Sequence, residues 1–331
     1  MDEKTIVVKK LSRIYKVHLK KEGVKASLKA LLHREYKYID AVKKINFTIN
    51  QGELVGFIGP NGAGKTTTLK MLGGLLYPSD GSIEVLGFTP FDRKEEYLKK
   101  ISLVLGQKNQ LWWDLPVIET LNLQKELYEI PDEDFKQSLN ELCTMLEIKD
   151  VLHQQVRQLS LGQRMKCELA AALIYKPKVL FLDEPTIGLD IFMQKKVREF
   201  IKQYNERYKA TVILTSHYMD DVKAICQRII MIDHGMIIFD GKLQDLIMLN
   251  ANYKILVPIF NSPVNIKELK TIGKIIEFDY PKAIITVPRE EVSQRAAELL
   301  KKFDIDDLDI NEPELEDVIN TFYEIKKHEH T

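Results

Sequence analysis

The chain has 331 residues, 45% of them hydrophobic and 29% charged, which is typical of a globular protein with one large domain and a smaller one. Basic and acidic residues are equal at 48 each, so no net charge draws the chain to nucleic acid or anionic lipid. No stretch approaches the ~20 apolar residues of a membrane-spanning helix, and the start lacks a secretory signal. Three cysteines without a CxxC pair indicate reduced, partly buried thiols in a cytosolic protein.

The N-terminal region predicts strands that lead into a glycine-rich loop. Residues 4–10 form a first expected strand, and residues 41–50 alternate apolar and polar side chains as strands do. The apolar strand expected at 54–58 runs directly into the glycine-rich segment 59–64. A helix is expected from 65 to about 75. Strand, glycine loop and helix is the context in which a phosphate-binding motif is credible.

The central region predicts a parallel sheet. Residues from about 115 to 165 are expected to be largely helical. Continuous apolar strands at 179–182 and 211–215 then alternate with helices, a pattern that implies a parallel sheet covered on both faces. Strands at 229–233 and 236–239 are expected to form a closing hairpin.

The pattern changes after about residue 250. Short strands are expected at 254–259, 275–278 and 283–287, and helices at 290–303 and 313–327. These elements predict a small α/β domain without recognisable chemistry of its own.

The glycine-rich segment fits the phosphate-binding pattern G-x-x-x-x-G-K-[ST] at every constrained position. Its glycines let backbone N–H groups surround phosphate oxygens, and the following helix points its positive end at them. Lys65 is expected to reach the β- and γ-phosphates, and the Thr66 hydroxyl to bind Mg²⁺. The nucleotide-binding residues predicted here are Gly59, Pro60, Asn61, Gly62, Ala63, Gly64, Lys65, Thr66 and Thr67.

Two carboxylates follow the strand at 179–182. Side chains alternate along a strand, so Asp183 and Glu184 can serve different tasks. Asp183 suits the Mg²⁺ shell, and Glu184 suits polarising the attacking water as a general base. Together with the phosphate-binding loop, the pair predicts a site for nucleotide phosphates and Mg²⁺.

At this point the sequence resembles the ABC-family ATPases. The specific marker is Leu159-Ser160-Leu161-Gly162-Gln163, which resembles the LSGGQ signature and precedes an expected helix at 164–175. Leu161 departs from the usual glycine and is interpreted as a tolerated variant, because Ser160, Gly162 and Gln163 carry the phosphate contacts that the resemblance implies. These residues would face the ATP held by the second subunit.

The resemblance also implies a fold. It predicts an α/β P-loop NTPase of the ABC ATPase type: a RecA-like parallel-sheet core, an antiparallel β subdomain and a helical subdomain at about 108–165. This ATPase domain would span residues 1–246, and the small α/β domain residues 251–331.

Further family elements follow in order along the chain. By resemblance, Gln107 is the glutamine that senses Mg²⁺ and γ-phosphate, Asp190 lies in the loop that crosses the dimer interface, and His217 contacts the γ-phosphate. The family also stacks the adenine on an aromatic residue, for which any ring face serves. Counting back from the phosphate-binding loop favours Tyr36, with Tyr15 as its rival.

An apparently inserted segment, residues 16–37, is strongly basic, and its expected helix at 23–33 carries an apolar stripe. It could touch anionic headgroups near a permease. The favoured alternative is a solvated surface helix, because charge runs are usually just solvated.

The function expected from these features is ATP hydrolysis in an ABC transporter. Two ATP-binding subunits, expected to be two copies of this chain, would work with a separately encoded integral-membrane permease at the cytoplasmic face of the membrane. The C-terminal segment 306–324 resembles that of export-type systems, which favours export. Adjacent tryptophans at 112 and 113 cannot both face one core direction, so at least one ring is expected to be partly exposed. By resemblance this region receives a cytoplasmic helix of the permease. The alternative is that both rings pack between the two lobes of the ATPase domain.

Two other readings compete. ABC ATPases that act on ribosomes or DNA generally carry two ATPase cassettes or a long coiled coil, and this sequence shows one cassette and no extended heptad run. A third interpretation is an ABC subunit that transmits a stress signal and transports no substrate.

Overall fold

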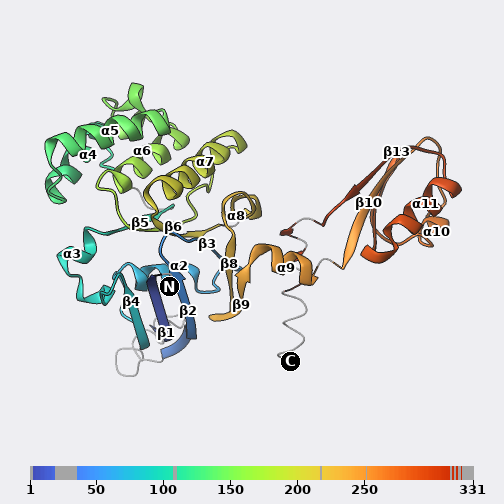
Figure 1. Cartoon of the computed structure of the whole chain (residues 1–331), viewed down its shortest axis with the longest axis horizontal. Helices are drawn as coiled ribbons and strands as arrows, with labels where there is room; N and C mark the ends of the chain where they lie inside the picture. The colour runs from blue at the N-terminus through green and yellow to red at the C-terminus, as the bar shows by residue number, and fades with distance from the viewer. Residues whose placement is uncertain are drawn as a thin grey trace, which may run out of the picture. The chain divides into compact units, whose positions relative to one another are not determined.

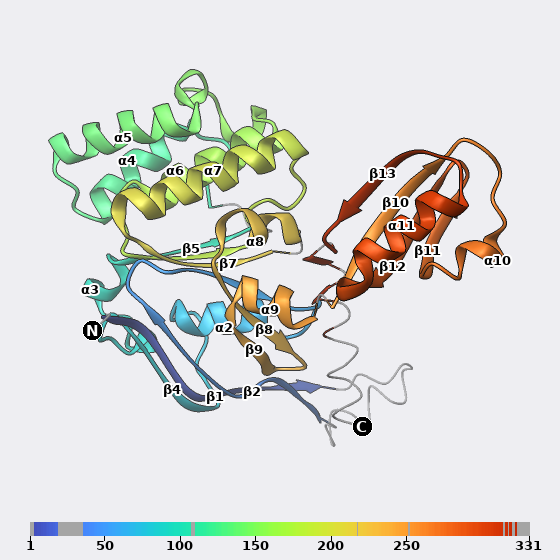
Figure 2. The same cartoon turned by 45° about the vertical axis from the view of Figure 1, so that its right-hand side comes forward.

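The computed structural model describes residues 3–18, 36–106, 110–216, 218–250, 252–313, 315–316, 318–319 and 322. The predictions for Gln107, for His217 and for the basic helix at 23–33 fall outside the described residues, as does most of the helix expected at 313–327. The chain divides into two compact units, residues 1–241 and 242–331 (Figures 1 and 2).

A six-stranded sheet forms the centre of the first unit. The strands in spatial order are β5 (Ile101–Leu105), β6 (Val179–Asp183), β7 (Thr211–Thr215), β3 (Leu54–Ile58), β8 (Arg228–Asp233) and β9 (Met236–Lys242). The pairs from β5 to β8 are all parallel, and β8 and β9 form a hairpin through His234 and Gly235. The parallel sheet expected from the apolar strands is therefore confirmed.

A smaller antiparallel sheet has the order β2-β1-β4, formed by β1 (Lys4–His18), β2 (Tyr36–Asn50) and β4 (Asp80–Val85). Strand β1 is longer than the sequence predicted because it pairs with β2 over its whole length, from Lys4 opposite Asn50 to His18 opposite Tyr36. Such pairing is supplied by the partner strand, and local periodicity does not reveal it.

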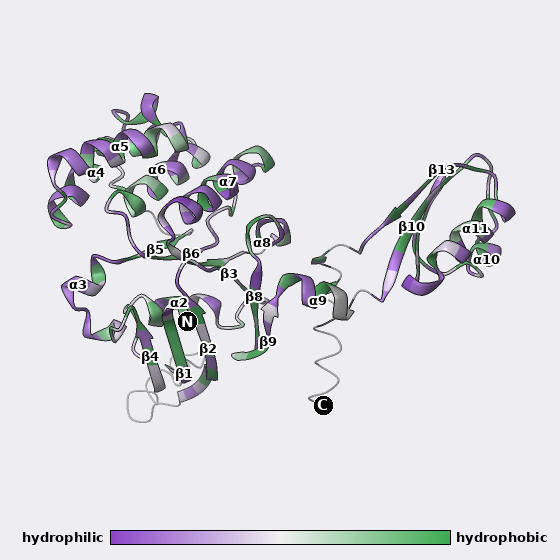
Figure 3. Cartoon of the chain, viewed as in Figure 1, coloured by the Kyte–Doolittle hydropathy of each residue, from purple (hydrophilic) through white to green (hydrophobic). Residues whose placement is uncertain are grey.

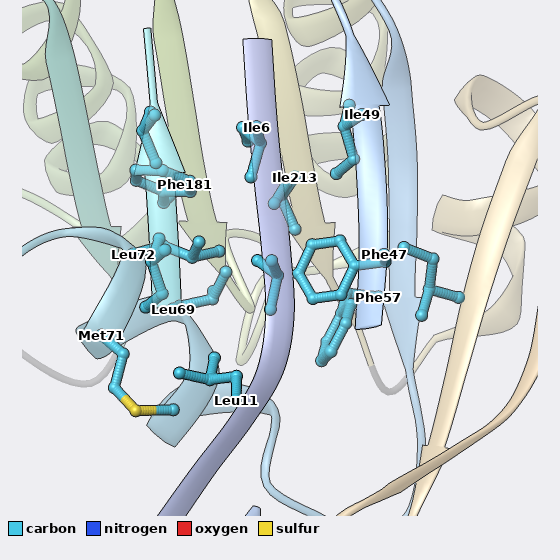
Figure 4. Close-up of a cluster of buried hydrophobic side chains, with 14 of the residues drawn as sticks. Ile6, Leu11, Phe47, Ile49, Phe57, Leu69, Met71, Leu72, Phe181 and Ile213 are labelled. Carbon is cyan, nitrogen blue, oxygen red and sulfur yellow. The ribbon is translucent and has the colours of Figure 1, made fainter. Parts of the chain in front are cut away.

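The main core lies between these two sheets. Helix α2 (Lys65–Leu72) runs between them, and its Leu69 packs with Phe47 of β2, Phe57 of β3 and Phe181 of β6 (Figures 2 and 4). The helix ends three residues before the predicted Leu75, where Gly73 and Gly74 follow. This packing holds the start of α2 next to the carboxyl ends of the parallel strands.

The remaining helices of the first unit include α3 (Glu95–Leu98), α4 (Val117–Leu127), α5 (Asp132–Leu146), α6 (Leu161–Leu173), α7 (Ile191–Tyr208) and α8 (Met219–Ile225). Helices α6 and α7 lie on the side of the six-stranded sheet opposite α2, and α4 and α5 pack on these two helices (Figures 1 and 2). In Figure 3, α4 and α5 show hydrophilic stretches, whereas the apolar residues of β6 and β7 are fully buried.

The second unit contains α9 (Leu243–Asn250), β10 (Tyr253–Phe260), α10 (Ile266–Leu269), β11 (Lys274–Asp279), β12 (Lys282–Pro288), α11 (Val292–Lys302) and β13 (Ile305–Asn311). Its antiparallel sheet has the order β11-β12-β10-β13. Strand β13 was not predicted, because its aspartates break the apolar pattern. It is an edge strand, where charged side chains are common. Short 3₁₀ helices occupy Pro90–Asp92, Lys149–Val151, Val156–Gln158 and Arg289–Glu291.

All three cysteines are free and buried, and burial raises the pKa of the Cys167 thiol to about 12. Over the part of the chain that the structure describes, no helix has both the length and the apolar character needed to cross a membrane.

Candidate nucleotide-binding and hydrolysis site

The phosphate-binding loop, residues 59–64, joins β3 to α2. Gly64 has a φ of 113°, and a β-carbon there would lie 2.5 Å from the carbonyl oxygen of Ala41, so the position requires glycine. Gly64 is also the N-cap of α2 and supplies no side-chain cap. The first N–H groups of α2 are therefore suited to bind an anion.

The side chain of Lys65, the first residue of α2, turns back to the loop. Its side chain is buried, and its Nζ donates to the carbonyl oxygens of Gly59 at 2.6 Å and Pro60 at 3.1 Å. Burial lowers the pKa of Lys65, and the nearby charges of Glu184 and Asp183 oppose this shift. The ammonium group thus contacts the loop and interacts with the charges of both carboxylates.

Asp183 connects three elements at the edge of the sheet. Thr66 of α2 donates to its Oδ2 at 2.8 Å, and Thr215 at the end of β7 donates to its Oδ1 at 2.6 Å. A hydroxyl and a carboxylate side by side are the hard oxygen ligands that Mg²⁺ prefers. The pair of Thr66 and Asp183 therefore fits a magnesium ion. The structure shows how Thr215, which the sequence analysis did not single out, orients this carboxylate.

Glu184 follows β6 with a φ of 56°, so the chain leaves the extended conformation at this residue. Its backbone N–H lies 3.1 Å from both the carbonyl oxygen and the Oγ1 of Thr215. Glu184 is partly exposed, whereas Asp183 is buried. The two acids thus have different surroundings at the carboxyl edge of the sheet, as their separate predicted tasks require.

Ser160 caps helix α6, which begins at Leu161, three residues before the predicted start. The Ser160 Oγ accepts from the Gln163 backbone N–H at 3.2 Å, and the Gln163 Oε1 accepts from the Ser160 N–H at 3.0 Å. This is a capping box, and the S-x-x-Q spacing was the signal that could have revealed the earlier start. Ser160 is exposed and Gly162 partly exposed, in the first turn of the helix.

Asp190 plays the same local role for α7. Its Oδ1 accepts from the Met193 backbone N–H at 2.9 Å. The next two side chains are unusually open, with Ile191 82% and Phe192 71% exposed. Exposed apolar side chains that adjoin each other mark a surface for contact with another protein.

The two candidate tyrosines lie in different places. The Tyr15 hydroxyl is 3.4 Å from the Thr67 Oγ1 of α2. Tyr36 contacts the His18 ring edge-on, and the Lys16 Nζ lies 4.0 Å from its ring centroid. Of the two candidates, Tyr15, the rival residue in the sequence analysis, is the one that the described residues show in contact with the helix after the phosphate-binding loop.

Both tryptophan rings reach the surface. Trp112 is 56% and Trp113 46% exposed, which confirms that at least one ring is uncovered. The guanidinium of Arg164, in α6, lies 5.5 Å from the Trp113 ring centroid. Helix α6, which begins within the signature motif, therefore contacts Trp113.

A phosphate-binding loop after β3 and a carboxylate pair at the end of β6, with β7 between the two strands of one parallel sheet, define the site of a P-loop ATPase. Within that class the chain belongs to the ABC transporter ATP-binding family, and the resemblance seen in its motifs is confirmed. A family model described as "ABC transporter" matches residues 42–187, and one described as "EvrA-like ABC transporter, C-terminal domain" matches residues 252–311.

Individual relatives agree with this assignment. The ABC transporter ATP-binding protein NatA of Bacillus subtilis is 37% identical over 210 residues, which are 63% of this chain and 85% of the relative. The linearmycin resistance ATP-binding protein LnrL of the same organism is 35% identical over 205 residues, which are 62% and 65% of the two chains. A solved dimeric ATP-binding cassette with bound ADP and Pi has a TM-score of 0.59 at 26% identity, covering 72% of this chain and 98% of its own. The chain is accordingly the ATP-binding, ATP-hydrolysing subunit of an ABC transporter.

Proposed function

We propose that two copies of this chain close on two ATP molecules and drive export through a separately encoded membrane permease, at the cytoplasmic face of the membrane. The observation that carries the proposal is the division of the site. Lys65, Thr66 and Asp183 form one connected group, whereas Ser160 is exposed and engaged with Gln163 of its own helix. An exposed helix N-terminus with a hydroxyl suits a phosphate presented by a second subunit.

The open apolar residues beside Asp190 support the same arrangement. Ile191 and Phe192 would be covered when two subunits meet, and hydrophobic burial of this kind stabilises association. The solved cassette with bound ADP and Pi is a related protein that forms a dimer.

Hydrolysis would use groups already close together. Thr66 and Asp183 would hold Mg²⁺, with Gln107 as a further predicted ligand, and the ion would neutralise charge on the β- and γ-phosphates. Glu184 would accept the proton of the attacking water, while Lys65 balances phosphate charge. His217 is the remaining predicted γ-phosphate contact.

Export over import is supported by the resistance named for one relative. The experiment that tests the whole proposal is purification of the tagged chain from native membranes, with identification of the proteins that co-purify. An integral-membrane protein in stoichiometric amount is expected. Co-purification with ribosomes or DNA instead would overturn the transport role.

The contact of Tyr15 with α2 leads to a prediction about the adenine. Tyr15→Ala is expected to weaken ATP binding by about 1–3 kcal/mol, the usual value of one base–aromatic stack. Tyr36→Ala serves as the matched control and is expected to change the affinity less than about twofold. Fluorescence titration with a labelled ATP analogue measures both. The opposite order of effects would return the adenine contact to Tyr36.

The exposed tryptophan pair leads to a prediction about the permease. Trp112→Ala is expected to reduce the yield of co-purified permease by roughly tenfold. Tryptophans that become buried when two proteins bind often contribute a large part of the binding free energy. Its thermal unfolding midpoint shows whether the variant is folded. Tyr77→Ala is the control, since Tyr77 is 63% exposed and lies outside this surface. An unchanged permease yield with a folded Trp112 variant would remove this residue from the interface.

A further inference from the structure

A buried carboxylate lies next to the hydrolysis site without belonging to any of its predicted motifs. Asp221, in α8, is fully buried. Its Oδ2 accepts hydrogen bonds from two buried hydroxyls, those of Thr186 and of Ser216, the latter at 2.6 Å. Asp220 and Asp221 form an acidic pair at the start of a helix, and such pairs are usually exposed to solvent. For this reason the sequence did not indicate that Asp221 is buried.

The other oxygen of Asp221 faces a cation. The Nη1 of Arg198, in α7, is 3.3 Å from Oδ1, and the side chains of both residues are largely shielded from solvent. Burying a carboxylate is costly unless it is paired and hydrogen-bonded. The arrangement of two hydroxyl donors and one guanidinium meets this condition, and each side of the carboxylate has its own partners.

These partners belong to segments that carry the chemistry. Thr186 follows Glu184 by two residues. Ser216 follows Thr215, which holds Asp183, and its hydroxyl also accepts from the backbone N–H of Tyr218 at 2.9 Å. Ser216 and Tyr218 flank position 217. Asp221 thus joins the loop after the general base, the two neighbours of position 217 and helix α7, whose N-cap is Asp190.

We propose that Asp221 is a positioning residue for ATP hydrolysis, because its carboxylate fixes the loop after Glu184 and Ser216 to each other and to α7. The proposal rests on the proposed function. Since a misplacement of about 1 Å can cost roughly 100-fold in rate, loss of this connection is expected to slow the chemical step. Nucleotide affinity depends on Lys65 and the loop, and should stay the same.

The test is Asp221→Asn in the full chain. The amide nitrogen of asparagine is a donor, and it would face either the hydroxyl donors or Arg198, so one side of the network is lost. The kcat for ATP hydrolysis is expected to fall by roughly 10- to 100-fold with KM unchanged within about twofold. Asp220→Asn is the matched control, because Asp220 is exposed on the same helix. A merely structural role would lower the amount of active protein and the unfolding midpoint, while the dependence of rate on ATP per folded subunit would stay unchanged.

Two milder variants decide the matter if Asp221→Asn does not fold. Ser216→Ala and Thr186→Val each remove one donor and leave the ion pair with Arg198, and each is expected to lower kcat several-fold at constant KM. A wild-type kcat in these variants, or in a folded Asp221→Asn, overturns the inference while the function stands. If the wild-type chain, assayed beside Glu184→Gln, hydrolyses no ATP, both the proposed function and the role of Asp221 are overturned.

Discussion

Glu184→Gln is expected to reduce ATP turnover by at least ~100-fold, the usual lower range for loss of a general base, and to leave a stable ATP-bound dimer. Glutamine has nearly the shape of glutamate but does not accept a proton from the attacking water. Binding should survive because Lys65 and the loop glycines lie on other elements. Subunits that bind ATP without cleaving it would stay closed together.

Gel filtration with ATP and Mg²⁺ measures this outcome directly. The variant should elute as a dimer with ATP and as a monomer with ADP. Glu84→Gln is the matched control, because Glu84 is exposed on β4 in the antiparallel sheet. A Glu184 variant that binds ATP and stays monomeric would show that another group carries the base function.

Lys65→Ala and Ser160→Ala are expected to separate binding from closure. Lys65→Ala should lose nucleotide binding by more than tenfold, since hydrogen bonds to charged groups contribute about 1.5–3 kcal/mol each. Ser160→Ala should leave the affinity of the monomer unchanged and slow hydrolysis, because Ser160 would meet phosphate only across the subunit interface.

Equilibrium titration under dilute conditions gives the monomer affinity, and phosphate release gives turnover. Lys70→Ala, on the same helix as Lys65, is the binding control. Ser160→Thr keeps both the hydroxyl oxygen and its proton and should retain most of the turnover. Equal loss of monomer affinity in the two alanine variants would contradict a site shared by two subunits.

The phosphate-binding side of the site could be predicted from the sequence because its determinants are local. Glycines set the backbone of the loop, an apolar strand precedes it and Lys65 begins the next helix. The positions of the acids at 183 and 184 are equally local, since Asp183 ends a buried strand and Glu184 follows it, and their separate roles stay predictions. Elements of this kind depend on neighbours a few residues away.

The rest depends on contacts between distant segments. The register of β1 against β2 brings Tyr15 near α2, and counting residues back from the loop cannot account for paired strands of this length. The buried network of Asp221 joins four segments, none of which indicates the others in sequence. Strand β13 exists because a sheet edge accepts its charges. Gln107 and His217 stay predictions.

The capping box at Ser160 has a consequence for how the sequence can drift. One hydroxyl serves twice: its oxygen receives the Gln163 amide, and its proton remains to be donated. Aspartate would cap the helix as well but would bring a negative charge toward a phosphate, and glycine would offer no proton. Threonine is therefore the replacement that keeps both functions of the hydroxyl without adding charge. The adjacent Leu161 is 42% exposed in the first turn, and its side chain neither caps the helix nor donates a hydrogen bond. Replacing Leu161 should therefore affect neither the helix cap nor the phosphate contact, whereas replacing Ser160 would affect both. Relatives that differ at the third position of the signature can thus share one mechanism.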